Sequence, residues 1–171
     1  MVRLGLVLDY FFIFSLGLVI GYLTVHVFLF LGDGLVIGLV NDYRFRPIFR
    51  LGLRFFEVVL IKNSQFSMAI YLLGFNRVVQ YLVMFIAGLV SGFLIASLAP
   101  WCAALGLAPH GVLELLGYSV AGVGGYEYFG LRKVSLRASL IRYLLPSLAL
   151  LVVAAFIESF VTIKVVSIIC G

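Results

Sequence analysis

The fold class of this chain is decided by residues 78–99, which read VVQYLVMFIAGLVSGFLIASLA. This stretch carries no charged side chain. A helix needs about 20 predominantly apolar residues to cross the hydrocarbon core of a bilayer. The stretch therefore predicts a membrane-spanning helix and directs attention to similar runs on either side of it.

The composition of the whole chain agrees with a set of membrane helices. Of its 171 residues 64% are hydrophobic and 11% are charged, and the mean hydropathy is +1.24. An average soluble domain is about half apolar and about a quarter charged. A soluble protein is therefore excluded, and little chain remains outside the helices for a separate catalytic domain.

Three other stretches are long and apolar enough to span a membrane, namely residues 10–31, 111–129 and 143–163. Residues 48–62 mix basic and apolar side chains at helical spacing, which predicts an amphipathic helix in the membrane interface. Residues 64–73 are apolar but too short to cross, so we expect a half-helix or the first part of a broken helix there. The sequence predicts an all-α polytopic membrane protein with one membrane domain, residues 1–171.

The basic residues predict the orientation of these spans. Nine of the twelve lie in two stretches, residues 44–62 and 132–142. Because lysine and arginine gather in cytoplasmic loops, we expect both stretches in the cytoplasm and Leu105 outside. The expected location is the plasma membrane, with several passes. The same clusters are typical of contacts with lipid headgroups, and we expect no nucleic-acid partner.

Polar residues inside the predicted spans form the candidate functional site. His110 and Glu114 are four residues apart and share one helix face, while Glu158 lies midway along the last span. A carboxylate at that depth needs protein, water or a partner beside it. The three residues either bind a proton, a cation or a substrate, or they bond to one another and fix the helix packing. We favour the structural interpretation.

The sequence offers little support for a cofactor or for catalysis. A catalytic zinc usually has three protein ligands, and His26 is remote from His110 and Glu114. We expect no metal and no other cofactor. Neither a serine nucleophile elbow nor a phosphate-binding loop is present, so we expect no enzyme activity.

Other residues are expected to serve helix packing or to break helices. Small residues four apart allow membrane helices to approach closely, and such rows are formed by Gly88 with Gly92 and by Gly117, Ala121 and Gly125. The residues expected at helix breaks and motif positions are Asn63, Pro109, Gly111 and Thr162. We expect residues 111–129 and 143–163 to pack side by side, with Glu158 facing Glu114 or His110.

Cys102 and Cys170 follow two outward span ends and can pair only if those spans are neighbours in an oxidising compartment.

Three stretches together resemble the stage II sporulation protein M family of prokaryotic membrane proteins. They are residues 109–130, which begin Pro-His-Gly, residues 154–162, and a central region from Lys62-Asn63 to Gly92. In the central region Lys62 and Ala87 stand where the family usually has asparagines. In sporulating bacteria the family member is a membrane platform for peptidoglycan-degrading proteins during engulfment.

The resemblance implies a non-enzymatic membrane scaffold or complex subunit. Its expected partners are membrane lipids and other membrane proteins, a second copy of the chain among them. The alternative is a transport component in which His110, Glu114 and Glu158 line a pathway.

Overall fold

The computed structural model describes residues 4–31, 52–96, 100–162, 164–165 and 168. These residues are almost entirely helical and contain no strand, which confirms the predicted all-α fold class. The long helices are α1 (Leu4–Leu31), α3 (Gly52–Leu72), α4 (Arg77–Ile95), α5 (Pro100–Gly125) and α7 (Leu145–Ile157). The short segments are the 3-10 turn η1 (Leu73–Phe75), α6 (Leu136–Ser139) and three π-helical turns, η2 (Tyr126–Gly130), η3 (Leu140–Leu144) and η4 (Glu158–Thr162).

Four helical segments among the described residues are long and apolar enough to cross a membrane. They are Leu4–Val27, Leu53–Phe75, Arg77–Ile95 and Leu136–Thr162. Their outward side chains are large and apolar, as lipid-facing surfaces are, with Phe12, Leu53 and Val78 each more than 60% exposed. The remaining long helix, α5, carries His110 and Glu114 and lies among the others.

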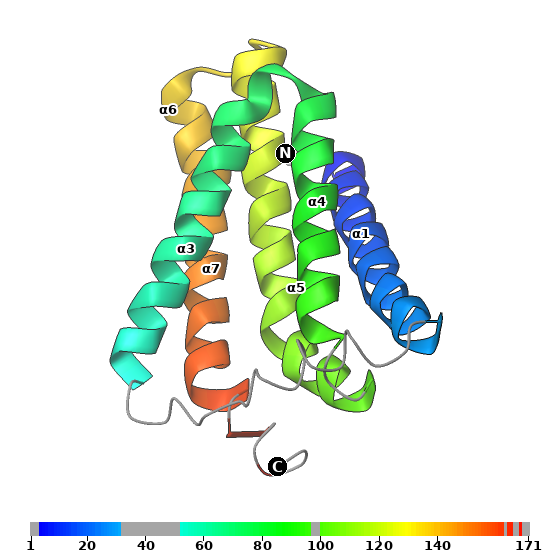
Figure 1. The fold of residues 1–171 in the computed structure, drawn as a ribbon. Coiled ribbons are helices and arrows are strands. Elements are labelled where there is room, and N and C mark those ends of the chain that lie inside the picture. The colour runs from blue at the N-terminus through cyan, green and yellow to red at the C-terminus, as the bar shows by residue number, and fades with distance from the viewer. Residues whose placement is uncertain (1–3, 32–51, 97–99, 163, 166–167, 169–171) are drawn as a thin grey trace.

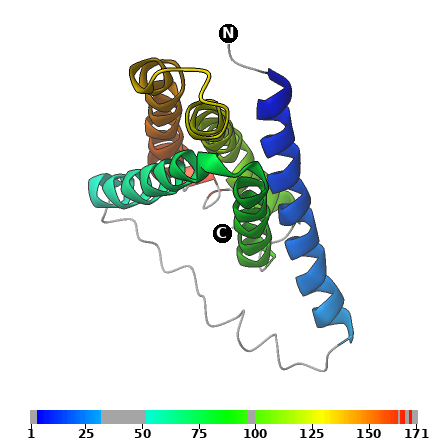
Figure 2. The ribbon, with the colours of Figure 1, turned by 90° about the horizontal axis from the view of Figure 1, so that it is seen from above.

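The long helices form one bundle around α5 (Figure 1). Seen from above in Figure 2, α7 and α3 lie on one side of α5, α4 lies next to α3, and α1 forms the outer edge beside α4. The largest helix contacts are between α1 and α4 and between α5 and α7. The core contains the fully buried side chains of Tyr10, Ile70 and Met84.

The glycines of α1 and α4 bring these two helix backbones into direct contact. A Cβ atom on Gly88 would overlap the carbonyl oxygen of Phe14, and one on Gly21 would overlap the carbonyl oxygen of Leu89. Gly17 and Gly92 are equally tight against the opposite backbone. Both helices therefore use the small-xxx-small spacing that permits close approach in a membrane.

The turn between α3 and α4 is fixed by one glycine contact and one cap. A Cβ on Gly74 would overlap the backbone of Gly125, so η1 rests directly on the end of α5. The side chain of Asn76 accepts hydrogen bonds from the backbone N–H groups of Val78 and Val79 at 2.9 and 3.3 Å. This capping satisfies donors that the first turn of α4 would otherwise leave open.

The structure corrects the expectation of an interfacial helix at 48–62 and a separate half-helix at 64–73. From Gly52 onward the two are one helix, α3, which runs without a break to Leu72; residues 48–51 lie outside the described residues. The continuous helix is long enough to cross a membrane. The polar pair Lys62-Asn63 does not end the helix. The hydrogen bonds of an α-helix join backbone N–H and C=O groups four residues apart, and polar side chains do not interrupt them.

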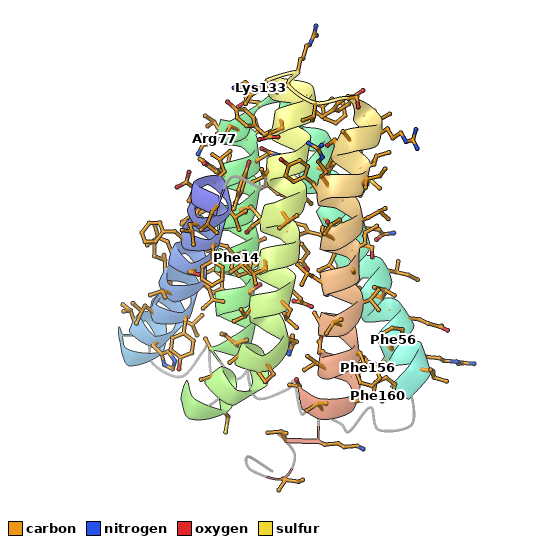
Figure 3. All side chains as sticks on the ribbon, turned by 180° about the vertical axis from the view of Figure 1, so that it is seen from behind. Phe14, Phe56, Arg77, Lys133, Phe156 and Phe160 are labelled. Carbon is orange, nitrogen blue, oxygen red and sulfur yellow. The ribbon has the colours of Figure 1, made fainter. Side chains whose placement is uncertain are left out.

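The predicted spans 78–99 and 111–129 leave residues 100–109 as a connecting loop, and this is also wrong, because α5 starts at Pro100 and continues through Pro109. Proline at the first position of a helix removes a donor that has no helical partner anyway. Pro109 lies inside the helix, and in Figures 1 and 3 the first turns of α5 bend away from the axis of the rest. Prolines are a common cause of such kinks.

The predicted placement of both basic stretches on one side is contradicted by the order of the helices. Three long helices, α3, α4 and α5, separate Arg54 from the turn at residues 131–135. In Figure 1 the start of α3 lies at the lower end of the bundle, together with the start of α5, and the turn lies at the upper end. Leu105 and residues 131–142 lie at opposite ends of the bundle, as predicted. Arg54 lies at the same end as Leu105, contrary to the prediction.

Cys102, in the first turns of α5, is disulfide-bonded. The only other cysteine of the sequence, Cys170, lies outside the described residues. The pairing of Cys102 with Cys170 stays a prediction.

Candidate functional site

The predicted polar cluster lies where α3, α5 and the α7–η4 segment meet. His110 and Glu114 come from one face of α5, and Glu158 and Thr162 are the first and last residues of η4. Asn63 belongs to the middle of α3. Because α5 starts at Pro100, Glu114 lies near the middle of its helix and not close to an end.

Two hydrogen bonds tie these three segments together. The side-chain amide of Asn63 donates to Oε1 of Glu114, which links α3 to α5. His110 Nδ1 and Thr162 Oγ1 lie 3.1 Å apart, which links α5 to η4. His110 and Thr162 are both more than nine-tenths buried, while Asn63 and Glu114 are half-buried.

Glu158, the first residue of η4, completes the cluster. It is half-buried and lies within electrostatic reach of both Glu114 and Tyr118. No hydrogen bond or ion pair engages its carboxyl group among the described residues. Two carboxyl groups therefore face one region of the bundle, one bonded to Asn63 and the other not.

The π-helical turn η4 shapes the lower part of the cluster. A π turn is wider than an α turn and occurs often at functional sites. Ser159, the second residue of η4, has a buried hydroxyl group without a hydrogen-bond partner in the described part of the chain. Phe160 lies against Phe56 of α3 and Phe156 of α7, with ring centroids 6.4 and 4.9 Å apart, and Figure 3 shows these three rings together.

The predicted packing of the last two long helices is confirmed. α5 and α7 are neighbours along much of their length, and Glu158 faces the side of Glu114. They approach closely at Gly117, where a Cβ would lie 3.1 Å from Leu151 Cδ2 and 3.2 Å from the carbonyl oxygen of Ser147. Ala121 is fully buried in the same interface.

The helix-break role expected of several residues is wrong. Asn63 lies inside α3, and Pro109 and Gly111 lie inside α5, so none of the three ends a helix. Thr162 is the last residue of η4 and contacts His110. The close-packing positions Gly88, Gly92 and Gly125 each lie against another backbone, as described above.

A second polar group, centred on Gln80 of α4, was missed by sequence reasoning. Its Oε1 accepts a hydrogen bond from the hydroxyl group of Tyr10, and its Nε2 donates to the carbonyl oxygens of Ile70 at 2.8 Å and Gly122 at 3.1 Å. Gln80 and Tyr10 are both 0% exposed. One side chain therefore joins α1, α3, α4 and α5.

Serine and tyrosine hydroxyl groups join α3 and α5 to α6 and α7. Ser67 and Ser147 share a hydrogen bond of 2.8 Å. Tyr71 donates to Ser139 at 2.8 Å, and Ser139 donates to the carbonyl oxygen of Gly124 at 2.9 Å. Single serines in apolar runs gave no sequence signal, because their partners are up to 80 residues away.

The cluster is poorly suited to hold a metal ion. Among the residues that the structure describes, no three histidine, cysteine, aspartate or glutamate side chains are grouped closely enough. Its members are amide, hydroxyl, imidazole and carboxyl groups that mostly bond to one another. Such groups hold membrane helices together, and two adjacent carboxyl groups can also share a proton or a small cation.

Comparison with known proteins gives one match. The family model of stage II sporulation protein M matches residues 10–163, which is nearly the whole chain. No curated protein and no solved structure matches the chain.

Proposed function

Because the chain belongs to the stage II sporulation protein M family, we propose that it is a non-enzymatic scaffold of the plasma membrane. It crosses the membrane several times and holds other membrane proteins in a complex. A second copy of the chain is one candidate partner.

The observation that carries this proposal is how the polar side chains inside the bundle are used. Asn63 bonds to Glu114, His110 to Thr162, and Tyr10 to Gln80, and each pair joins two different helices. Contacts of this kind stabilise membrane bundles by about 0.6 kcal/mol each on average. They support a rigid body more than a reaction centre.

The proposal extends membrane crossing from the four candidate spans to α5 as well. α5 carries His110 and Glu114, but it packs against α7, α3 and α1, so its polar residues face protein. Disulfides form in oxidising compartments. The disulfide of Cys102 therefore supports an outward placement of the end that carries the start of α5, and a cytoplasmic placement of residues 131–135.

Cross-linking in intact cells tests the scaffold. The tagged chain is expressed near its natural level, cross-linked with a short membrane-permeable reagent and purified in mild detergent. We expect one or a few proteins, or a second copy, in fixed ratio to the chain. Recovery of the chain as a monomer without any partner in fixed ratio would contradict the proposal.

A transport role is the second candidate, and Glu158 is the observation in its favour. Its carboxyl group has no hydrogen-bond partner among the described residues and lies near Glu114. Two carboxyl groups that repel each other when charged are suited to hold one proton or one small cation between them.

Flux measurements in proteoliposomes separate the two candidates. Vesicles that hold the purified chain are loaded with pH- or Na⁺-sensitive dyes and compared with empty vesicles. The scaffold predicts no flux above the background in the wild type. Flux that Glu158→Gln abolishes would favour the transport candidate instead.

A further inference from the structure

An apolar furrow runs along the surface of the segment formed by α6, η3 and the start of α7. It has a volume of about 440 Å³, and its lining from Leu136 to Leu148 is aliphatic except for Arg137. Ile141 and Leu145 are 54% and 58% exposed, so the furrow opens away from the bundle.

The furrow arises from the spacing of its lining residues. Leu136, Leu140 and Leu144 are four residues apart, and so are Arg137, Ile141 and Leu145. Rows of this spacing form parallel ridges on a helix, with a groove between them. The π-helical turn η3, Leu140–Leu144, falls in the middle of both rows.

One end of the furrow is basic. Arg137 forms part of the lining. Arg132, Lys133 and Arg142 are all exposed on the same segment or in the turn before it, and Figure 3 shows Lys133 at this end of the bundle. The neighbouring acid, Glu127, is buried and accepts a hydrogen bond of 2.7 Å from Tyr143. The accessible charge is therefore positive.

The position and charge of the furrow together select its occupant. The furrow lies on the segment Leu136–Thr162, which is long and apolar enough to span a membrane, so its aliphatic lining meets lipid acyl chains. Basic residues at a membrane surface attract anionic headgroups. We propose that the furrow binds an anionic phospholipid, with one acyl chain along the leucines and the phosphate at Arg137.

Lipid retention measured by native mass spectrometry tests this proposal. The full chain is reconstituted in nanodiscs with equal amounts of phosphatidylglycerol and phosphatidylcholine, and the lipids that remain bound on release are counted. We expect phosphatidylglycerol to be retained in preference to phosphatidylcholine. Arg137→Gln should weaken this retention about fivefold, which corresponds to the loss of one basic contact at the surface.

Two matched controls make the test specific to the furrow. Arg54→Gln removes an exposed arginine at the opposite end of the bundle and should leave retention unchanged. Ile141→Trp fills the furrow and should abolish retention, whereas Val153→Trp, at a site that is 50% exposed on the same helix but outside the furrow, should not. Thermal unfolding of each variant confirms that it is folded.

Three results would overturn the proposal. Equal retention of the two lipids would remove the role of charge. Equal losses in Arg137→Gln and Arg54→Gln would show a general charge effect. Undiminished retention in Ile141→Trp would show that the acyl chain lies elsewhere.

Discussion

Asn63 of α3 donates a hydrogen bond to Glu114 of α5 and so links two helices that are not consecutive in the sequence. The hydrogen bond between their side chains is formed inside the bundle, where water competes little for the carboxyl group. A hydrogen bond from an amide offsets part of the free-energy cost of burying a carboxyl group. The contact is therefore a measurable part of the link between α3 and α5.

A double-mutant cycle on Asn63→Leu and Glu114→Leu measures this contact. We expect a coupling of about 0.6–1.7 kcal/mol in the free energy of unfolding, the range found for hydrogen bonds between membrane helices. Reversible unfolding of the four proteins in mixed micelles gives the value. Strictly additive losses would show that the two side chains do not interact.

Gln80 should contribute more than Asn63, because it is fully buried and makes three hydrogen bonds. We expect Gln80→Leu to lower the free energy of unfolding by about 1–3 kcal/mol, since it leaves the buried Tyr10 hydroxyl group without a partner. Gln65→Leu is the matched control, because Gln65 is exposed on α3. Similar stabilities of the two variants, in the same unfolding assay, would contradict the importance of the Gln80 network.

At the level of the helices, the pair α1–α4 depends on glycines that no larger residue can replace. A Cβ at Gly88 meets the backbone of α1, which cannot move aside as a flexible side chain would. Gly5 lies on the same pair of helices, but a Cβ added there would meet no atom within 4 Å. A substitution at Gly88 therefore tests helix packing, whereas the same substitution at Gly5 tests helix propensity alone.

We expect Gly88→Ala to destabilise the protein by about 1–3 kcal/mol through overpacking. Gly5→Ala should be neutral or slightly stabilising, because alanine favours a helix by about 1 kcal/mol over glycine. Thermal unfolding in detergent compares the two. A stabilised Gly88→Ala would mean that α1 and α4 are not in backbone contact.

The apolar runs predicted three of the five long helices well. α4 and α7 appear as uninterrupted hydrophobic stretches, and length alone identifies them. α1 starts at Leu4, before the predicted start at residue 10, because Asp9 lies inside the helix. α3 was divided in two because Lys62-Asn63 looks like an interruption. The interruption disappears in the fold, since the amide of Asn63 has a partner on α5 that lies 51 residues away.

The sequence predicted the parts of the candidate site that share one helix face, but not the hydrogen bonds between helices. The spacing of His110 and Glu114 placed both residues together, and the need of Glu158 for a protein environment placed it towards them. The Asn63–Glu114 and His110–Thr162 pairs depend on tertiary packing. Gln80 was missed for the same reason, because a lone glutamine in an apolar run does not show which backbone groups will surround it.

At the level of the whole molecule, the basic residues do not decide the orientation. Arg54 lies at one end of the bundle, while Arg77, Arg132 and Lys133 lie at the other. Arg77 is partly used within the protein, since it forms an ion pair with Asp9. The disulfide of Cys102 therefore carries more weight for orientation than the distribution of charge does.

Accessibility of single cysteines tests the proposed crossing of the membrane by the bundle most directly. Cys102 and Cys170 are first replaced by serine, and a cysteine is then placed at Arg54 or at Ser135, both at the ends of the bundle. An impermeant maleimide is added to intact cells and then to permeabilised cells. We predict that Arg54→Cys is labelled in intact cells and that Ser135→Cys is labelled only after permeabilisation. Equal labelling of the two positions in intact cells would contradict the crossing, and the reverse order would contradict the orientation.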